Sequence, residues 1–253
     1  MSTLDFPRAS SRSAHPGWWL ANVLQLLFTV AWTITGICVV PLVALAGGRA
    51  AALRMASWYW ARGLFAGAGA RLVVEGADAI DWSRPLVLVA NHQSMIDICA
   101  LFRAVPVPLR FMLKQELSKV PFVGWYARAM GMVFIDRGNP RDARRSLRAA
   151  VDTLHRGATL CAFPEGTRSR DGSVGPFKGG AFQLAIEAGV PVVPVAIEGS
   201  GVVLPPSGFA VRPGTICVRF GTPIATSALQ AQDRSALAQR SREAVAELLR
   251  IAR

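Results

Sequence analysis

Lysine and closely spaced cysteine are both scarce in this chain. Only 3 of its 28 basic residues are lysine, and 16 acidic residues leave a net charge of +12. This balance favours anionic partners such as anionic lipid, phosphorylated substrates or nucleic acid, and arginine suits bidentate contact with phosphate. The wide cysteine spacing excludes a Cys-x-x-Cys metal or redox motif. Cys38, Cys99, Cys161 and Cys217 each lie in an apolar stretch, which predicts buried free thiols in a reducing compartment.

Two further motifs are missing. The chain has no G-x-S-x-G sequence, which argues against a lipid hydrolase, and Ser94 lies too close to His92 along the chain for attack on a substrate. It also has no recognisable motif for reading nucleic acid. A membrane-bound basic nucleic-acid-binding protein stays an alternative of a different class, although no nucleic-acid partner is expected. Nothing in the sequence calls for a metal or another cofactor.

A long uncharged segment lies near the amino terminus. Residues 18–48 contain no charged residue over 31 positions, whereas about 20 helical residues cross a bilayer core. The segment is too long for the apolar part of a signal peptide. Either one tilted span or two shorter helices, broken near Gly36 or Pro41, would accommodate it. Arginines flank both ends, and positive flanks prefer the cytoplasmic face, so the charge favours a hairpin that enters and leaves on one side.

The sequence pattern changes near residue 70. This shift divides the chain into a membrane-anchoring helical segment, residues 1–70, and an α/β domain, residues 71–253. Residues 50–67 mix arginines with aromatics, which suits either the lipid interface or a packed amphipathic helix. Short apolar runs then alternate with helical spacing, which predicts a mostly parallel sheet of about seven strands flanked by helices. The expected strands are residues 71–75, 85–90, 109–113, 132–136, 158–163, 192–197 and 215–220, and the expected helices are residues 94–104, 123–130, 141–154, 178–188 and 233–251.

A histidine follows one expected strand, at the sheet edge where ligands of such sheets usually bind. His92 comes after residues 85–90 and precedes Asp97 by five positions. If His92 lies on the turn and Asp97 in the first helical turn, the carboxylate can hold one ring nitrogen and leave the other as a general base. An aspartate in that position is more often a helix cap, so the spacing alone does not decide.

Cationic loops follow other expected strands. Residues 163–170 contain Glu165, Gly166, Thr167 and Arg168; the glycine permits close backbone approach, and the last two residues supply donors for an anion. Lys178 precedes a helix whose amino terminus adds positive potential. Arg137 follows residues 132–136, where a guanidinium can hold phosphate. An ordinary solvated loop explains each stretch equally well. Pro191 and Pro194 suggest that residues 192–197 form an edge, a bulge or an irregular wall.

Four motifs taken together, in this order, resemble the glycerolipid acyltransferase family. They are Asn91-His92-x₄-Asp97, residues 134–137 (Phe-Ile-Asp-Arg), residues 163–168 (Phe-Pro-Glu-Gly-Thr-Arg) and residues 190–194 (Val-Pro-Val-Val-Pro). The resemblance spans residues 70–225, and a membrane segment before it is also typical of the family. No departure removes a key residue.

The resemblance implies a reaction. His92 would deprotonate an acceptor hydroxyl, which attacks the thioester of acyl-CoA or acyl-carrier protein directly, and Asp97 would orient His92. Arg137, Glu165, Gly166, Thr167 and Arg168 would form the phosphate site, with Glu165 positioning the cations. The expected product is phosphatidic acid, made from lysophosphatidic acid by acylation at sn-2 on the cytoplasmic face of the inner or plasma membrane. Another lyso-lipid, such as lyso-ornithine lipid, stays an alternative because pocket shape sets acceptor choice.

Overall fold

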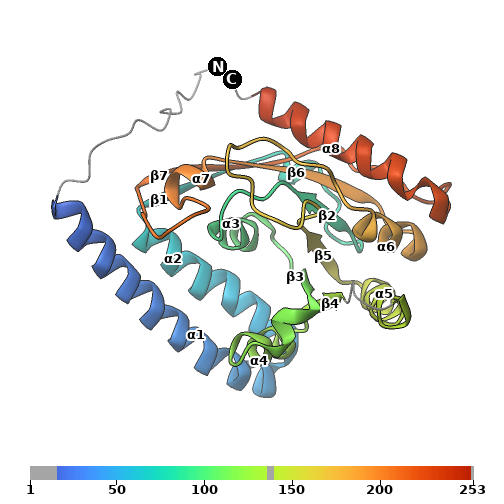
Figure 1. Cartoon of the computed structure of the whole chain (residues 1–253). Coiled ribbons are helices and arrows are strands. Elements are labelled where there is room, and N and C mark those ends of the chain that lie inside the picture. The colour runs from blue at the N-terminus through green and yellow to red at the C-terminus, as the bar shows by residue number, and fades with distance from the viewer. Residues whose placement is uncertain (1–15, 136–139, 252–253) are drawn as a thin grey trace.

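The computed structural model describes residues 16–135 and 140–251 and contains a long helical hairpin packed on an α/β sheet (Figure 1). The hairpin begins with α1 (Pro16–Met55) and continues through η1 (Ala56–Ala61) into α2 (Arg62–Gly67). Gly48 interrupts α1 with φ 76° and ψ 174°, a conformation that glycine adopts at little cost. The chain reverses there, and the Trp32 ring stacks on Tyr59 with centroids 4.2 Å apart.

The position of this turn corrects one expectation. Gly36 and Pro41 both lie inside continuous helix, so a break near either residue is wrong. A proline inside a helix can be tolerated with a kink, whereas the backbone at Gly48 has left helical geometry altogether. The chain does double back, as the hairpin alternative requires; how it lies in a bilayer stays a prediction.

The outer face of the hairpin is apolar. Measured by length and composition, one helix among the described residues could cross a membrane. Six large apolar side chains on α1 are between 56% and 86% exposed, namely Trp19, Leu20, Leu24, Leu27, Leu42 and Leu45. Exposed apolar surface of this extent marks an interaction site, and its composition indicates association with a membrane. Cys38 lies on this face and is exposed, so its predicted burial is wrong, whereas Cys99, Cys161 and Cys217 are buried free thiols.

The sheet confirms the expected fold class. Its strands are β1 (Ala70–Glu75), β2 (Val87–Ala90), β3 (Leu109–Lys114), β4 (Val133–Ile135), β5 (Thr159–Ala162), β6 (Val192–Glu198) and β7 (Gly214–Phe220). Their order is β1-β7-β6-β2-β5-β3-β4, and only the β6–β7 pair is antiparallel. The strands β2, β5, β3 and β4 therefore all end at one edge, where the loops after them can meet.

Of the three alternatives for residues 192–197, the edge is wrong, because β6 lies between β2 and β7. Pro194 is tolerated there because the β7 ladder begins one residue later, at the Val195–Phe220 pair. The carbonyl of Pro194 accepts from Gly221 N at 2.8 Å. The N–H that proline lacks would point to the same side, where β6 and β7 are not yet paired in a regular ladder.

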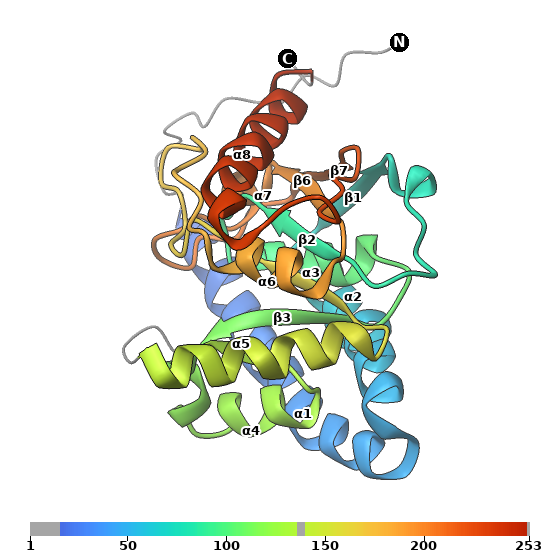
Figure 2. The same ribbon diagram turned by 90° about the vertical axis from the view of Figure 1, so that its right-hand side faces the viewer.

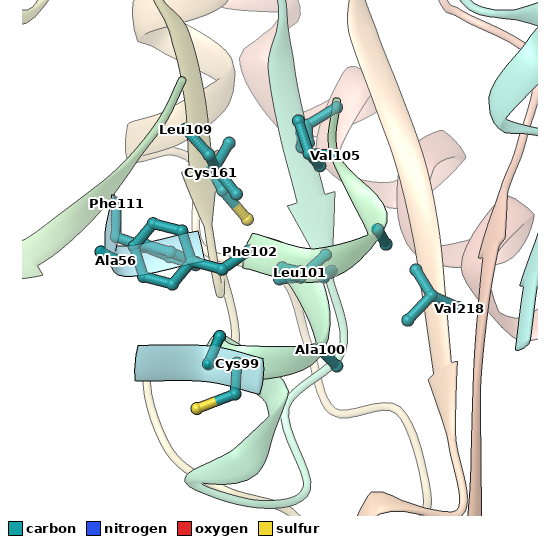
Figure 3. Close-up of a cluster of buried hydrophobic side chains, with 14 of the residues drawn as sticks. Ala56, Cys99, Ala100, Leu101, Phe102, Val105, Leu109, Phe111, Cys161 and Val218 are labelled. Carbon is teal, nitrogen blue, oxygen red and sulfur yellow. The ribbon is translucent and has the colours of Figure 1, made fainter. Parts of the chain in front are cut away.

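Helices cover both faces of the sheet (Figures 1 and 2). The hairpin and α3 (Ile96–Ala104) pack on one face, and α5 (Pro140–His155), α6 (Gly180–Ala188) and α8 (Arg234–Arg250) pack on the other. The shorter elements are η2 (Ala77–Ala79), η3 (Gln115–Lys119), α4 (Val123–Ala129), α7 (Ser200–Val203) and η4 (Ala231–Asp233). Figure 3 shows α3 in the core, where Phe102 lies beside Phe111 of β3 and Ala56 of η1.

The hairpin and the α/β sheet share this core. Leu53, Ala56 and Phe65 of the hairpin are each at most 1% exposed and pack in the same cluster as α3. The second half of the hairpin is thus a packed amphipathic helix that also exposes Trp58 by 71%. Division of the chain into two domains at residue 70 stays a prediction.

Candidate active site

His92 and Asp97 form a hydrogen-bonded pair where β2 ends. His92 lies on the turn after β2, and Asp97 is the second residue of α3, which is the arrangement that the sequence required. The imidazole Nδ1 lies 2.8 Å from Oδ2 of Asp97, and the two side chains are 15% and 0% exposed. A carboxylate can only accept, so Nδ1 carries the hydrogen and Nε2 presents a lone pair. No described residue hydrogen-bonds to Nε2.

Asp97 also shapes the loop that carries the histidine. Its Oδ2 accepts the backbone N–H groups of Gln93 and Ser94, both at 2.8 Å. The same oxygen therefore orients His92 and fixes the turn before α3, whereas the N-cap residue of α3, Met95, makes no side-chain cap hydrogen bond. Oδ1 of Asp97 is buried and has no hydrogen-bond partner among the described residues.

The loop after β5 packs directly against His92. The imidazole stacks on the Phe163 ring with centroids 4.0 Å apart and an interplanar angle of 16°. The Ser169 N–H donates to the His92 carbonyl at 2.7 Å. The ring is thus held by a carboxylate at one edge and by an aromatic face, so Nε2 keeps a fixed direction.

Glu165 supports the backbone of this site. Its Oε1 accepts the His92 N–H at 2.9 Å, and its Oε2 accepts the Gly175 N–H at 3.0 Å. The residue is 8% exposed, and burial raises its pKa, although the two N–H groups favour the charged form. The expected role of Glu165 in positioning cations stays a prediction, and in the structure its two oxygens accept from backbone N–H groups.

Arg242 on α8 holds the far side of the same loop. Its Nε and Nη2 donate to the Val174 carbonyl at 3.2 and 2.9 Å, and Nε also donates to the Gly175 carbonyl at 3.0 Å. A chain of hydrogen bonds therefore runs from Arg242 through Gly175 and Glu165 to the His92 backbone. Sequence reasoning missed Arg242, because no local pattern on an amphipathic helix marks it.

The predicted anion-binding residues gather around the same edge. Thr167, Arg168 and Lys178 are exposed, and Lys178 N donates to the Pro164 carbonyl at 3.0 Å, which brings its loop beside residues 163–168. Gly166 has φ 76°, which only glycine adopts readily, and it closes the turn after Phe163. Neither Arg168 nor Lys178 is ion-paired with another described residue. Arg137 lies outside the described residues, so its placement stays a prediction.

Lys114 is a further cation that sequence reasoning missed. It is the last residue of β3, which runs parallel to β5, so its backbone reaches the edge that carries residues 163–168. Its side chain is exposed. The signal that could have found it is a basic residue at the end of an expected buried strand.

An apolar cavity lies beside the loop that carries His92, between α3 and the hairpin. It has a volume of about 200 Å³. Met95 and Ile96 line it next to His92, and Thr29, Trp60 and Leu64 line it from the hairpin. The described residues contain no group of three or more His, Cys, Asp or Glu side chains that could hold a metal ion.

Comparison with known proteins places this geometry in a family. A family model described as acyltransferase matches residues 71–198, just over half of the 253-residue chain. A crystal structure of the 1-acyl-sn-glycerophosphate acyltransferase PlsC from Thermotoga maritima is similar, with 30% identity and a TM-score of 0.72. The similarity covers 89% of this chain and 96% of that one.

Curated relatives carry related names. A chloroplastic 1-acyl-sn-glycerol-3-phosphate acyltransferase of Arabidopsis thaliana is 38% identical over 53% of this chain and 38% of its own length. An enzyme of the same name from Pseudomonas aeruginosa is 39% identical over 61% of this chain and 59% of its own length. The chain thus spans less than two thirds of these relatives. By its matched residues and its fold, the chain belongs to the acyltransferase family.

Proposed function

We propose that the protein acylates the sn-2 hydroxyl of lysophosphatidic acid, with acyl-CoA or acyl-carrier protein as the donor. The observation that carries this proposal is the 2.8 Å contact of His92 with Asp97, which leaves Nε2 without a partner among the described residues. The names of the relatives, all 1-acyl-sn-glycerol-3-phosphate acyltransferases, support the choice of acceptor.

The chemistry is a direct transfer. Nε2 of His92 takes the proton from the acceptor hydroxyl while the hydroxyl oxygen attacks the thioester carbonyl carbon. The C–S bond then breaks, and the departing thiolate takes the proton from His92, which returns the histidine to its neutral form. Asp97 keeps the imidazole in the productive tautomer and stabilises the imidazolium that forms.

The cations around the edge suit the acceptor's phosphate. Thr167 and Arg168 are exposed on the loop whose Ser169 N–H donates to the His92 carbonyl, Lys178 is exposed on the segment bonded to Pro164 of that loop, and Arg137 is expected to join them. Glu165 and Gly166 act on the backbone of the loop rather than on phosphate. The apolar cavity between α3 and the hairpin suits a fatty acyl chain, because apolar residues line it almost entirely.

The hairpin would bring this site to the substrate's own membrane. Its exposed apolar face and its flanking arginines suit the cytoplasmic face of the inner or plasma membrane. The acceptor could then enter the site without leaving the lipid phase.

The decisive experiment is a transfer assay with purified full-length protein in lipid. Radiolabelled acyl-CoA and acyl-carrier protein are each offered with a panel of lyso-lipids that includes lysophosphatidic acid and lyso-ornithine lipid. We expect transfer to lysophosphatidic acid and none with His92→Ala. Transfer only to another lyso-lipid would overturn the acceptor but keep the mechanism. No transfer to any acceptor, together with salt-sensitive DNA binding, would favour the nucleic-acid alternative.

A further inference from the structure

A second apolar surface lies outside the hairpin and outside the catalytic edge, which is the sheet edge that carries His92, Asp97 and residues 163–168. We call it the apolar knob, and it is built by η3, α4 and the turn between them. Its side chains are Leu117, Val120, Phe122, Val123 and Trp125, which are 38%, 42%, 59%, 44% and 61% exposed. Single exposed apolar residues are ordinary, but five within nine positions form a patch that marks an interaction site.

The backbone of the knob is strained. Phe122 has φ 61° and ψ −52°, and it is the only non-glycine residue with positive φ in the described ranges. The Val123 N–H donates to the Pro121 carbonyl at 2.7 Å, which closes a γ-turn of the rare kind. Strain of this sort persists at functional sites. The Phe122 ring at the centre of this turn packs edge-on against Trp125, with centroids 5.3 Å apart. Phe122 as a whole is 59% exposed.

The knob adjoins the hairpin. The α1 and α4 helices pack against each other, and Figures 1 and 2 show them side by side at the turn of the hairpin. Near Gly131, just after α4, the side chain of Arg49 lies against the backbone. The knob and the hairpin therefore lie next to each other in space, although they are distant in sequence.

Cations border the knob. A groove of about 800 Å³ separates α4 from α5 and is lined by Arg49, Lys119, Arg128 and Arg145, with Asp142 as its one acidic lining residue. Arg110 lies beside Arg49, and burial together with the charges of Arg49 and Arg156 lowers its pKa. An apolar patch with a cationic border is complementary to the surface of an anionic bilayer.

We propose that the apolar knob inserts into the lipid interface as a second membrane anchor beside the hairpin. The inference rests on the proposed action of the protein at a membrane, and it adds a contact that the hairpin alone would not make. Two separate anchors would fix the orientation of the α/β sheet on the bilayer, whereas one hairpin would let it tilt.

Depth-sensitive fluorescence tests this directly. In the full chain, Cys38→Ser removes the exposed native thiol, and the other three cysteines are buried. A single new cysteine, Val123→Cys or Trp125→Cys, is then labelled with an environment-sensitive fluorophore. The control is Arg240→Cys, an exposed site on α8 on the opposite side of the molecule. Vesicles contain phosphatidylcholine and phosphatidylglycerol in equal parts, with or without a nitroxide quencher on the acyl chain. We expect the quencher to dim positions 123 and 125 and to leave position 240 unchanged.

The possible results separate the two claims. Protein that sediments with vesicles while both knob labels stay unquenched would overturn the second anchor and leave membrane binding intact. Protein that does not sediment would overturn membrane binding and the anchor together. Labels that become protected without vesicles, increasingly so at higher protein concentration, would mean that a second copy covers the knob, and the inference would be wrong.

A substitution measures the size of the effect. Phe122→Ser with Trp125→Ser removes two exposed rings, so folding should be unchanged. We expect vesicle affinity to fall about tenfold or more, since each ring buries substantial apolar area. The matched control is Trp82→Phe, a partly buried tryptophan outside the knob and the hairpin, which should leave affinity unchanged. Equal affinity of the double variant and the wild type would contradict the proposal.

Discussion

Two regions of the molecule depart from the usual rule in opposite ways: charged side chains are buried at the catalytic edge, and apolar side chains are exposed on the outer face of the hairpin. At that edge, the Asp97 carboxylate is 0% exposed and Glu165 is 8% exposed, and hydrogen bonds compensate for their burial. On the hairpin, leucine and tryptophan are up to 86% exposed. The first region needs fixed directions for a few atoms, and the second needs only a broad apolar face. Changes at the edge should therefore alter turnover, and changes at the hairpin should alter stability and membrane binding.

The largest effect should come from His92→Ala. Removal of the general base is expected to lower the transfer rate by about 10²–10⁴-fold. Vesicle co-sedimentation should be unchanged, because the hairpin and the knob keep their apolar surfaces. Initial rates and sedimentation of one preparation provide the measurement, and His155→Ala, at the exposed end of α5, is the control. A variant that keeps full activity would remove His92 from the mechanism.

Asp97→Asn should have a somewhat smaller effect. The amide can still accept from the N–H groups of Gln93 and Ser94, so the loop keeps its shape. It no longer stabilises an imidazolium, and we expect kcat to fall by about 10²-fold, within the range for general-base catalysis. KM for the acceptor should change little. An increased KM at constant kcat would instead point to a role in binding.

Arg242→Ala tests whether the catalytic edge extends to α8. The variant frees the carbonyls of Val174 and Gly175 and loosens the loop that holds Glu165. We expect kcat to fall by about tenfold, the equivalent of about one lost hydrogen bond to a charged group. Arg240→Ala, an exposed residue on the same helix, should have no effect.

A double-mutant cycle decides whether this arginine acts through Glu165. If it does, Arg242→Ala should cost much less in kcat when Glu165→Gln is already present. Strictly additive effects on kcat would show that Arg242 does not act through Glu165. Thermal melting of each variant separates this result from a general loss of folded protein.

The sequence predicted the strands and the His92–Asp97 arrangement because both depend on short-range pattern. Apolar runs set the strands to within two residues at every end, and the five-residue spacing allowed a histidine on the turn to meet an aspartate in the first helical turn, which is the arrangement observed. Glu165 was assigned to the right loop, but its hydrogen bonds to the backbone N–H groups of His92 and Gly175 were missed, since periodicity does not show them. Arg242 was missed because its contacts span 67 and 68 positions of sequence.

The hairpin turn shows a different limit. Pro41 is the strongest helix breaker in the apolar segment, yet the helix continues through it and turns at Gly48. Sequence shows which residues can break a helix; packing decides which one does. Here Trp32 of the first arm stacks on Tyr59 of the second arm. Trp60 of the second arm packs against Phe102 of α3 with centroids 6.3 Å apart. Such contacts fix where the arms must align, and the turn follows from that alignment.

The last prediction concerns this alignment, and it is an effect on stability with no expected effect on the chemical step. A Cβ at Gly63 would lie 2.1 Å from the Trp32 ring, which already stacks on Tyr59 and cannot move away freely. Gly63→Ala should therefore lower the free energy of unfolding by about 1–3 kcal/mol, despite the better helix propensity of alanine. The control is Gly180→Ala at the start of α6, where a Cβ meets nothing within 4 Å, and it should stabilise by about 0.4–1 kcal/mol. Chemical denaturation in a mild detergent measures both. A Gly63→Ala protein as stable as the Gly180→Ala protein would show that the two arms do not pack as closely as this hairpin requires.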